Sequence, residues 1–207
     1  MVSTVIKGGD RTERRRIHPH KFAMWLAIAS IMMMFAGLTS GYIVREAQGA
    51  WRYFVMPKIF WISTVAIMLS SVTFHFGLRA FRQRERIKYR RLMATTVLLG
   101  IAFMVLQVLG FWQLFHTRQA TVIDGVQEVT KFRVRGGNPS EGFLFIITGL
   151  HLLHILAGVI ALLVVYLRAY RKRVKVYNST GLEIVGTFWH FVDLLWIYLF
   201  IFFLANQ

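Results

Sequence analysis

His190 and Asp193 lie three residues apart in the segment 188–196, FWHFVDLLW, inside an apolar run that continues almost to the C-terminus. Residues at positions i and i+3 of a helix lie on one face, one turn apart. An imidazole and a carboxyl group placed there could ligate a metal, carry protons, or join helices through hydrogen bonds. Ionisable groups at membrane depth are costly, so each is expected to have a partner or a function.

A second pair of polar residues, His151 and His154, has the same spacing in the preceding apolar run. Glu183 lies immediately before the last run, and His75 lies in an earlier one. Together these side chains could form one buried polar cluster at a helix–helix contact, where each group satisfies another. The candidate site residues, as structural, lipid-binding or subunit contacts, are His151, His154, Glu183, His190, Asp193, Trp189 and Trp196.

Three functions compete for these residues. A haem held by two histidines takes one from each of two helices, so His151 and His154 cannot flank one ring, and only a pair such as His75 with His190 is left. The chain has no cysteine, and a copper or zinc site lacks its usual set of ligands. A proton relay stays open, because His and Asp carry protons in pumps. We favour a structural role that joins the last two apolar segments and seats a lipid headgroup or a neighbouring subunit.

Long apolar segments must position these residues. The chain has 207 residues, of which 56% are hydrophobic. About 20 apolar residues in a helix cross a hydrocarbon core of about 30 Å, and a transmembrane barrel would show short alternating segments instead. We therefore predict an all-α polytopic membrane protein, with a basic cytoplasmic tail over 1–21 and a five-helix transmembrane domain over 22–207. The predicted spans are 22–44, 58–78, 92–115, 142–167 and 184–205.

The distribution of basic residues predicts the orientation. Of the 25 Lys and Arg residues, 18 lie in the N-terminal tail and in the loops after the second and fourth spans, and 7 lie on the opposite side. This places the N-terminus in the cytoplasm and the C-terminus outside. The net charge of +16 is explained by topology and anionic headgroups rather than by nucleic acid. Arg79, Arg82 and Lys172 could hold headgroups, although positive-inside anchoring alone explains them.

Two further local features are predicted. Asp124-Gly125, in the loop 116–141, suits a tight turn between two short strands, and the alternative is a disordered loop. Small residues inside the spans favour close helix–helix approach; these are Gly41, Gly100, Gly110, Gly149 and Gly158. The sequence has no triad, phosphate-binding glycine loop or paired carboxylate site, so we predict no catalytic residue.

Four segments carry a family resemblance. FWHFVDLLW at 188–196 resembles the last-helix signature of haem–copper oxidase subunit III, and TGLHLLHILAG at 148–158 is similar to that family's preceding helix. Glu183, which follows Gly-Leu, matches a family glutamate, and LGIAFMVLQ at 99–107 resembles a third motif. The resemblance covers nearly the whole chain from the first span onward.

The resemblance implies the short five-helix bacterial form of a subunit without a redox centre, with haem and copper carried by partner subunits. Such a subunit packs against catalytic subunit I, beside subunit II and other respiratory subunits. It binds phospholipid in a cleft and supports proton uptake in a bacterial inner membrane. The complex, most closely a cytochrome c oxidase, reduces dioxygen and translocates protons in aerobic respiration. Alternatives are subunit III of a quinol oxidase and an accessory protein of a nitric oxide reductase.

The sequence departs from the family at two carboxylates. Ile31 stands where the family's first retained helix has a buried glutamate, and Gly110 replaces a second glutamate in the third span. Their loss favours structure and lipid binding over a path of titrating groups. Outside the family, a b-type cytochrome anchor would bind haem on this chain alone. A small transporter would often show a repeat-related pair of broken helices, which the sequence lacks.

Overall fold

The computed structural model describes residues 19–49, 56–116, 118–123, 126–131, 139–170 and 180–206. Within these ranges, five helices are long and apolar enough to cross a membrane, which confirms the predicted fold class. Each helix extends beyond its predicted span at one end or both. Two of the helices begin at a proline, Pro19 or Pro139, because proline is well tolerated in the first helical turn. The helices are α1 (Pro19–Glu46), α2 (Ile59–Arg82), α3 (Arg86–His116), α4 (Pro139–Tyr170) and α5 (Thr180–Ala205).

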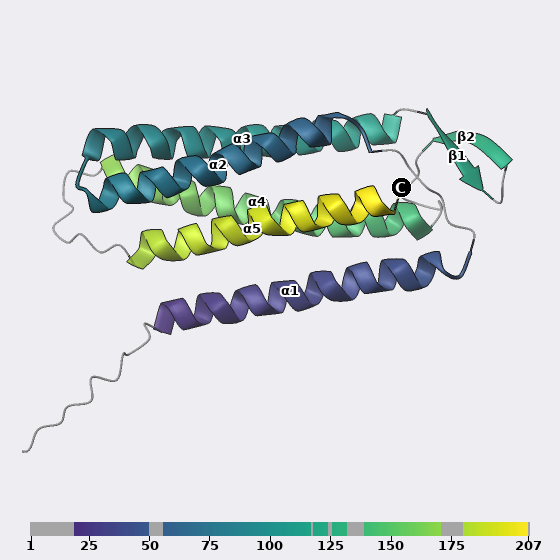
Figure 1. Ribbon diagram of the computed structural model, residues 1–207, viewed down its shortest axis with the longest axis horizontal. Coiled ribbons are helices and arrows are strands. Elements are labelled where there is room, and N and C mark those ends of the chain that lie inside the picture. Colours follow the sequence, from purple (N-terminus) through teal and green to yellow (C-terminus); the bar gives the residue numbers. More distant parts are fainter. Residues whose placement is uncertain are drawn as a thin grey trace, which may run out of the picture.

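The helices run side by side, and α1 stands apart from the α2–α3 pair (Figure 1). The most extensive packing joins α2 to α3, whereas α1 packs against α4 and α5. α5 is the most enclosed helix, with 44% of its most apolar window buried, against 17% for α1. The residues predicted to matter therefore lie mostly on the central helix.

The turn between α2 and α3 is only three residues long. Arg84 has a φ of 60°, and its amide donates to the carbonyl of Phe81 while the Glu85 amide donates to the carbonyl of Ala80. These two bonds form a Schellman motif, in which glycine is the usual residue at the left-handed position. The tight turn makes α2 and α3 antiparallel neighbours and places both of their adjoining ends at one end of the bundle.

A two-stranded hairpin lies between α3 and α4. β1 (Arg118–Ile123) pairs antiparallel with β2 (Val126–Lys131), from the pair Arg118 and Lys131 to the pair Ile123 and Val126. The hairpin that was predicted in the loop 116–141 is therefore confirmed. Asp124 and Gly125 themselves lie outside the described residues.

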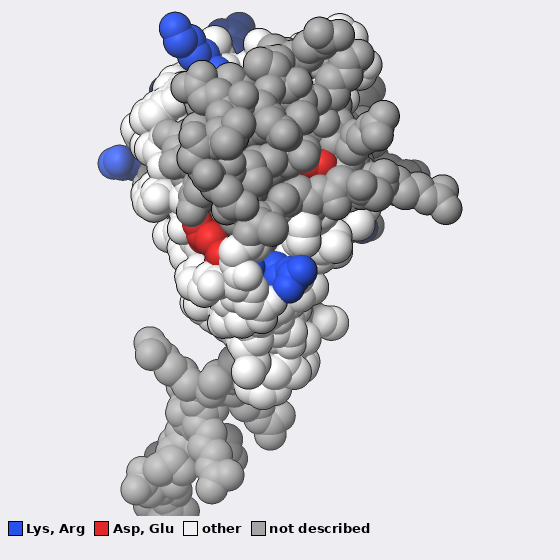
Figure 2. Space-filling model, turned by 90° about the vertical axis from the view of Figure 1, so that its right-hand side faces the viewer, with Lys and Arg blue, Asp and Glu red and all other residues white. Residues whose placement is uncertain are grey.

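The two ends of the bundle differ in where the described charged side chains lie. Figure 2 views the end near the hairpin, where the described Lys, Arg, Asp and Glu side chains do not gather into a patch. The opposite end holds the α2–α3 turn and its arginines, and also the start of α1 and of α5. The described arginines of the α2–α3 turn therefore lie at the end of the bundle opposite the hairpin.

Trp189 on α5 fills a space made by two glycines. A Cβ added at Gly100 on α3 would lie 2.9 Å from the indole, and one at Gly158 on α4 would lie 3.0 Å from it. Close approach was also predicted correctly at Gly110, where an added Cβ would lie 2.9 Å from Phe60. These glycines let α3 and α4 come close enough to α2 and α5 to bury large aromatic rings.

Other glycines behave differently. At Gly149 an added Cβ would meet nothing within 4 Å, so the prediction of a close approach there was wrong. Gly41 makes only ordinary contact with Phe143, at 3.4 Å. Gly186 was missed by the sequence reasoning, although an added Cβ would lie 2.4 Å from Phe74. Spacing along one helix does not reveal which face a bulky neighbour from another helix will meet.

Candidate functional site

The candidate site residues do not form the single cluster that the sequence suggested. His151 and His154 lie on α4 against aromatic rings, whereas Glu183 and His190 line a pocket between α1, α2 and α5. Asp193 lies buried on α5 and has no hydrogen bond to any of the other four within the described residues. The idea that each group satisfies another is therefore wrong for these side chains.

Several polar side chains of α5 make hydrogen bonds with α2. The Trp189 indole N–H donates to Ser70 Oγ over 3.2 Å, and the Trp196 indole N–H donates to Thr64 Oγ1 over 3.0 Å. His190 Nδ1 is hydrogen bonded to the Ser71 hydroxyl. Of the contacts expected between the fourth and fifth helices, the structure shows the His151–Trp196 ring contact, whereas α2 supplies these hydrogen-bond partners. The serine and threonine residues of α2 form no sequence motif, so these contacts between α2 and α5 could not be predicted from the sequence.

His151 is the most enclosed histidine of the described chain, with 1% of its surface exposed. Its ring stacks on Trp196, with 5.3 Å between centroids and 21° between planes. Neither ring nitrogen has a hydrogen-bond partner among the described residues. One turn later, His154 Nδ1 lies 2.7 Å from the Leu150 carbonyl oxygen, and its ring meets Phe35 edge-on at 5.8 Å. Both histidines are therefore aromatic packing elements of α4.

Asp193 is 4% exposed, and neither carboxyl oxygen makes a hydrogen bond within the described part of the chain. Ser71, whose hydroxyl is hydrogen bonded to His190, lies close to the Asp193 carboxyl group. A serine hydroxyl has one proton to donate, so it cannot donate to the carboxyl group and to the imidazole at once. In the described structure Ser71 is bonded to His190, and the Asp193 carboxyl group is left without a hydrogen bond among the described residues.

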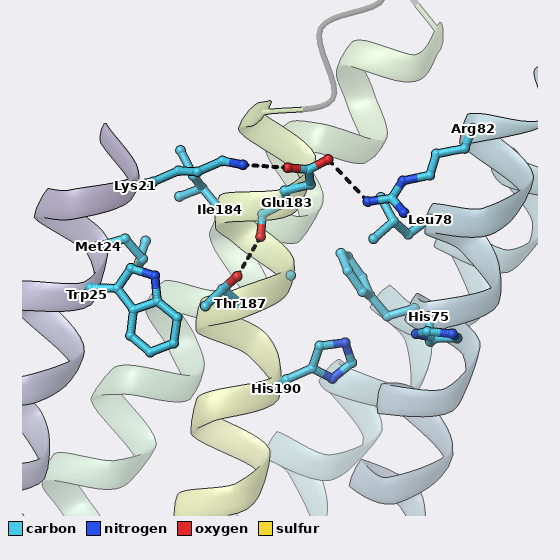
Figure 3. A pocket seen from close by; sticks show the side chains of 12 residues that line it. Lys21, Met24, Trp25, His75, Leu78, Arg82, Glu183, Ile184, Thr187 and His190 are labelled. Atoms are coloured by element: carbon cyan, nitrogen blue, oxygen red, sulfur yellow. Dashed lines mark hydrogen bonds and ion pairs between the residues drawn. The ribbon is translucent and has the colours of Figure 1, made fainter. Parts of the chain in front are cut away.

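Glu183 joins three helices. Its carboxylate lies 2.8 Å from Lys21 Nζ on α1 and 3.2 Å from an Arg82 guanidinium nitrogen on α2 (Figure 3). The Thr187 hydroxyl, one turn along α5, donates to the Glu183 backbone carbonyl over 2.9 Å. Lys21 was assigned to the tail, and its pairing across 162 residues had no signal in the sequence.

A pocket of about 370 Å³ opens beneath this ionic group. Its rim carries charges, and its deeper wall carries two imidazoles, from His75 and His190, with aromatic and aliphatic side chains (Figure 3). α1 forms one side, α2 the other, and α5 the floor. The lining residues are Lys21, Met24, Trp25, Phe74, His75, Leu78, Arg82, Glu183, Ile184, Gly186, Thr187 and His190.

The described residues contain no group of three or more His, Asp or Glu side chains that could hold a metal ion. The His151 ring lies nearly parallel to the Trp196 indole, and His154 Nδ1 is bonded to the Leu150 carbonyl oxygen. Lys172, which was considered as a headgroup contact, lies outside the described residues. What this arrangement can do is bind a charged amphiphile at the pocket.

Five membrane-crossing helices around an aromatic core define a polytopic, all-helical membrane protein, which packs by glycine contacts and short polar bonds. The family model for cytochrome c oxidase subunit III matches residues 20–205, and the chain belongs to this family. The resemblance seen in the sequence is confirmed, and the chain is a subunit III of the haem–copper oxidase class that associates with other oxidase subunits.

Curated relatives agree with this assignment. The chain is 33% identical to cytochrome c oxidase subunit 3 of Corynebacterium diphtheriae over 178 residues, which cover 82% of this chain and 80% of the relative. It is 29% identical to the probable cytochrome c oxidase subunit 3 of Nocardia farcinica, and the match covers 86% of this chain and 82% of that relative. It is also 25% identical to the probable quinol oxidase subunit 3 of Staphylococcus aureus, and the match covers 87% of this chain and 86% of that relative.

Proposed function

We propose that the chain is the non-redox subunit III of a proton-pumping cytochrome c oxidase. The observation that carries this proposal is the family match over 20–205. The relatives at 33% and 29% identity are named as cytochrome c oxidase subunits, which favours cytochrome c as the electron donor. The relative at 25% identity, named as a quinol oxidase subunit, supports the second candidate, subunit III of a quinol oxidase.

Within the complex, the chain stabilises the catalytic subunit, while subunits I and II hold the haem and copper. The outward faces of the helices carry large apolar side chains, such as Trp61 at 53% and Leu98 at 66% exposure. Lipid or neighbouring subunits cover such faces in a bilayer.

The complex lies in a bacterial inner membrane, with the N-terminus of this chain in the cytoplasm and its C-terminus outside. The support is the division of 18 against 7 basic residues between the two sides. In this orientation the Glu183 ionic group and the α2–α3 turn face the cytoplasm. The hairpin faces the periplasmic or external side.

The pocket between α1, α2 and α5 binds a phospholipid. Lys21 and Arg82 lie at the cytoplasmic ends of their helices, where headgroup phosphates lie. Below them, Trp25 and Leu78 give the pocket an apolar wall that suits the glycerol and upper acyl region. A lipid bound there would fill the space between α1 and α2 and hold α1 in place.

The chain supports proton uptake by keeping the catalytic subunit intact, and not by carrying protons itself. The departure at Ile31 supports this proposal, since that position cannot titrate. If His190→Ala or Asp193→Ala left assembly and subunit retention intact but slowed only proton uptake, this part of the proposal would be wrong.

The first test is a pull-down of the tagged chain from native membranes in mild detergent. We expect a large catalytic subunit to co-elute with a haem signal in the reduced-minus-oxidised spectrum. The eluate should oxidise reduced cytochrome c, and turnover with quinol alone would instead select the second candidate. Elution of the chain alone and colourless would remove the main support for the oxidase assignment.

A further inference from the structure

We propose that Met32, Met33 and Met34 of α1 form a trap for organic hydroperoxides dissolved in the membrane. The thioether of each residue reduces one hydroperoxide to the alcohol and becomes a sulfoxide. The three side chains belong neither to the hydrophobic core nor to the lining of the pocket. The inference therefore goes beyond the proposed function and stands on a different part of the chain.

The three methionines point away from the bundle. Methionine is a flexible side chain that commonly fills gaps in a packed core. Here the exposed fractions of Met32, Met33 and Met34 are 57%, 77% and 36%. Consecutive residues of a helix point about 100° apart, so the three side chains cover about 200° of the surface of α1. The next residue, Phe35, is buried and marks the side of α1 that meets the other helices.

Met33 stands clear of its neighbours along α1. A helical side chain meets the side chains three and four residues away on either side. For Met33 these are Ala29, Ser30, Ala36 and Gly37, which are all small and all exposed. A Cβ added at Gly37 would meet nothing within 4 Å. The thioether of Met33 is therefore open to a molecule that approaches from outside the bundle.

The group lies at the middle of α1, which runs from Pro19 to Glu46. Met32 lies 13 residues after the first residue of α1, and Met33 lies 13 residues before the last. At 1.5 Å per residue, the group is about 20 Å from either end of the helix. A hydrocarbon core of about 30 Å extends about 15 Å to each side of its middle. The exposed thioethers therefore face hydrocarbon, in which an apolar oxidant dissolves and a charged oxidant does not.

The chemistry needs no further co-reactant. The sulfur attacks the terminal oxygen of the hydroperoxide, the O–O bond breaks and an S–O bond forms. The hydroperoxide proton passes to the departing alkoxide, which leaves as the alcohol. Sulfur loses two electrons and the hydroperoxide gains two. The chain has no cysteine, so methionine supplies all of its sulfur. A methionine sulfoxide reductase is needed to restore the thioether.

Mapping of sulfoxides tests the site in the intact complex. Native membrane vesicles are treated with cumene hydroperoxide, and the peptides of this chain are analysed by mass spectrometry. We expect Met33 to be oxidised about tenfold faster than Met93 or more, because Met93 is 0% exposed and is reached only through local opening. Peroxymonosulfate, a charged oxidant that stays in water, should leave Met32, Met33 and Met34 unoxidised.

Three mapping results would overturn the site. Equal rates at Met33 and Met93 would show that exposure does not govern the oxidation. Oxidation of Met33 by peroxymonosulfate as fast as by cumene hydroperoxide would place the group in water. Absence of sulfoxide from all three methionines would show that a neighbouring subunit covers this face. The mapping uses the unaltered chain, so it decides the question even if a variant fails to assemble.

The protective effect is tested with Met32→Leu/Met33→Leu/Met34→Leu, which keeps the side-chain volume nearly constant. During exposure to cumene hydroperoxide, the oxygen consumption of vesicles with this variant should decline about twofold faster than that of wild type, because the thioethers are gone. Met68→Leu is the matched control, since it removes a single methionine that is 52% exposed on α2. It should change the rate of decline less than the triple variant does. Equal decline in the triple variant and wild type would overturn the trap.

Discussion

At the scale of single residues, the two buried indole N–H groups of α5 are satisfied across helices by small hydroxyl side chains. Ser70 accepts from the Trp189 indole and donates to the Thr96 carbonyl over 3.3 Å, so one side chain links α5, α2 and α3. Thr64 accepts from the Trp196 indole and donates to the Phe60 carbonyl of its own helix, so it links α5 to α2 only. Each indole is thereby fixed in position as well as buried. Polar contacts of this kind set the rotation of α5 relative to α2.

Gly100→Ala should destabilise the subunit by about 1–3 kcal/mol, because the added Cβ would lie 2.9 Å from the Trp189 ring. Thermal unfolding of the purified chain in detergent measures this change. Gly149→Ala is the matched control, since an added Cβ there meets nothing within 4 Å. Equal stability of Gly100→Ala and wild type would show that the Trp189 seat is not tightly packed.

Replacement of Glu183 tests the ionic group. Glu183→Gln should weaken the attachment of α1 by up to about 1 kcal/mol, since both ion pairs are partly exposed. Because an amide cannot neutralise the two cations, the thermal stability of the variant should depend less on salt than that of wild type. The control is Lys88→Gln, which removes an ion pair within the α2–α3 region. An unchanged salt dependence in Glu183→Gln would mean that the group contributes nothing to stability.

At the scale of elements, α1 differs from the other four helices. Only 17% of its most apolar window is buried, and its buried residues are Ile28, Phe35, Thr39 and Tyr42. Thr39 Oγ1 lies 2.9 Å from the Tyr198 hydroxyl of α5, and the Lys21–Glu183 pair joins the two helices near the other end. Two polar contacts near opposite ends therefore set the position of a helix that has a small apolar interface.

The α2–α3 turn offers a prediction at this scale. Arg84→Gly should stabilise the chain by about 1 kcal/mol, because a non-glycine residue with a φ of 60° carries a steric cost that glycine avoids. Arg86→Gly is the comparison, since the same change inside the first turn of α3 should destabilise the helix. The two variants can be ranked by thermal unfolding in detergent. If Arg84→Gly unfolds at a lower temperature than wild type, other contacts of Arg84 outweigh the strain.

At the scale of the whole molecule, the charge asymmetry, the five spans, and the α2–α3 turn and hairpin at opposite ends form one consistent topology. Basic residues gather beside the α2–α3 turn, and the hairpin occupies the other end. The ionic group of Glu183 and the lipid pocket belong to the basic end. The site that we propose for phosphate therefore lies where the charge of the chain and the anionic leaflet meet.

The orientation can be measured directly because the chain has no cysteine. Single cysteines introduced by Asn206→Cys and Glu85→Cys report the two sides. We expect a membrane-impermeant maleimide to label Asn206→Cys in spheroplasts and to label Glu85→Cys only after the membrane is permeabilised. Labelling in the opposite order would reverse the assigned topology and would place the lipid pocket in the outer leaflet.

The sequence by itself determined the number, type and approximate bounds of the spans and the family, and it indicated the hairpin without excluding a disordered loop. These follow from local properties: apolar length sets a span, Asp124-Gly125 marks a turn, and motif residues lie next to one another in the chain. The predicted spans were shorter than the helices, because polar residues outside the hydrocarbon region can stay helical.

Only the tertiary structure decided how the polar residues are grouped. The spacing of His151, His154, His190 and Asp193 fixed which residues share a face, but not which helix meets that face. Helix rotation depends on side-chain packing between segments far apart in sequence. For this reason α2, and not α4, bonds to the polar groups of α5, and Lys21 and Arg82 meet at Glu183. The pocket exists only because α1, α2 and α5 converge there.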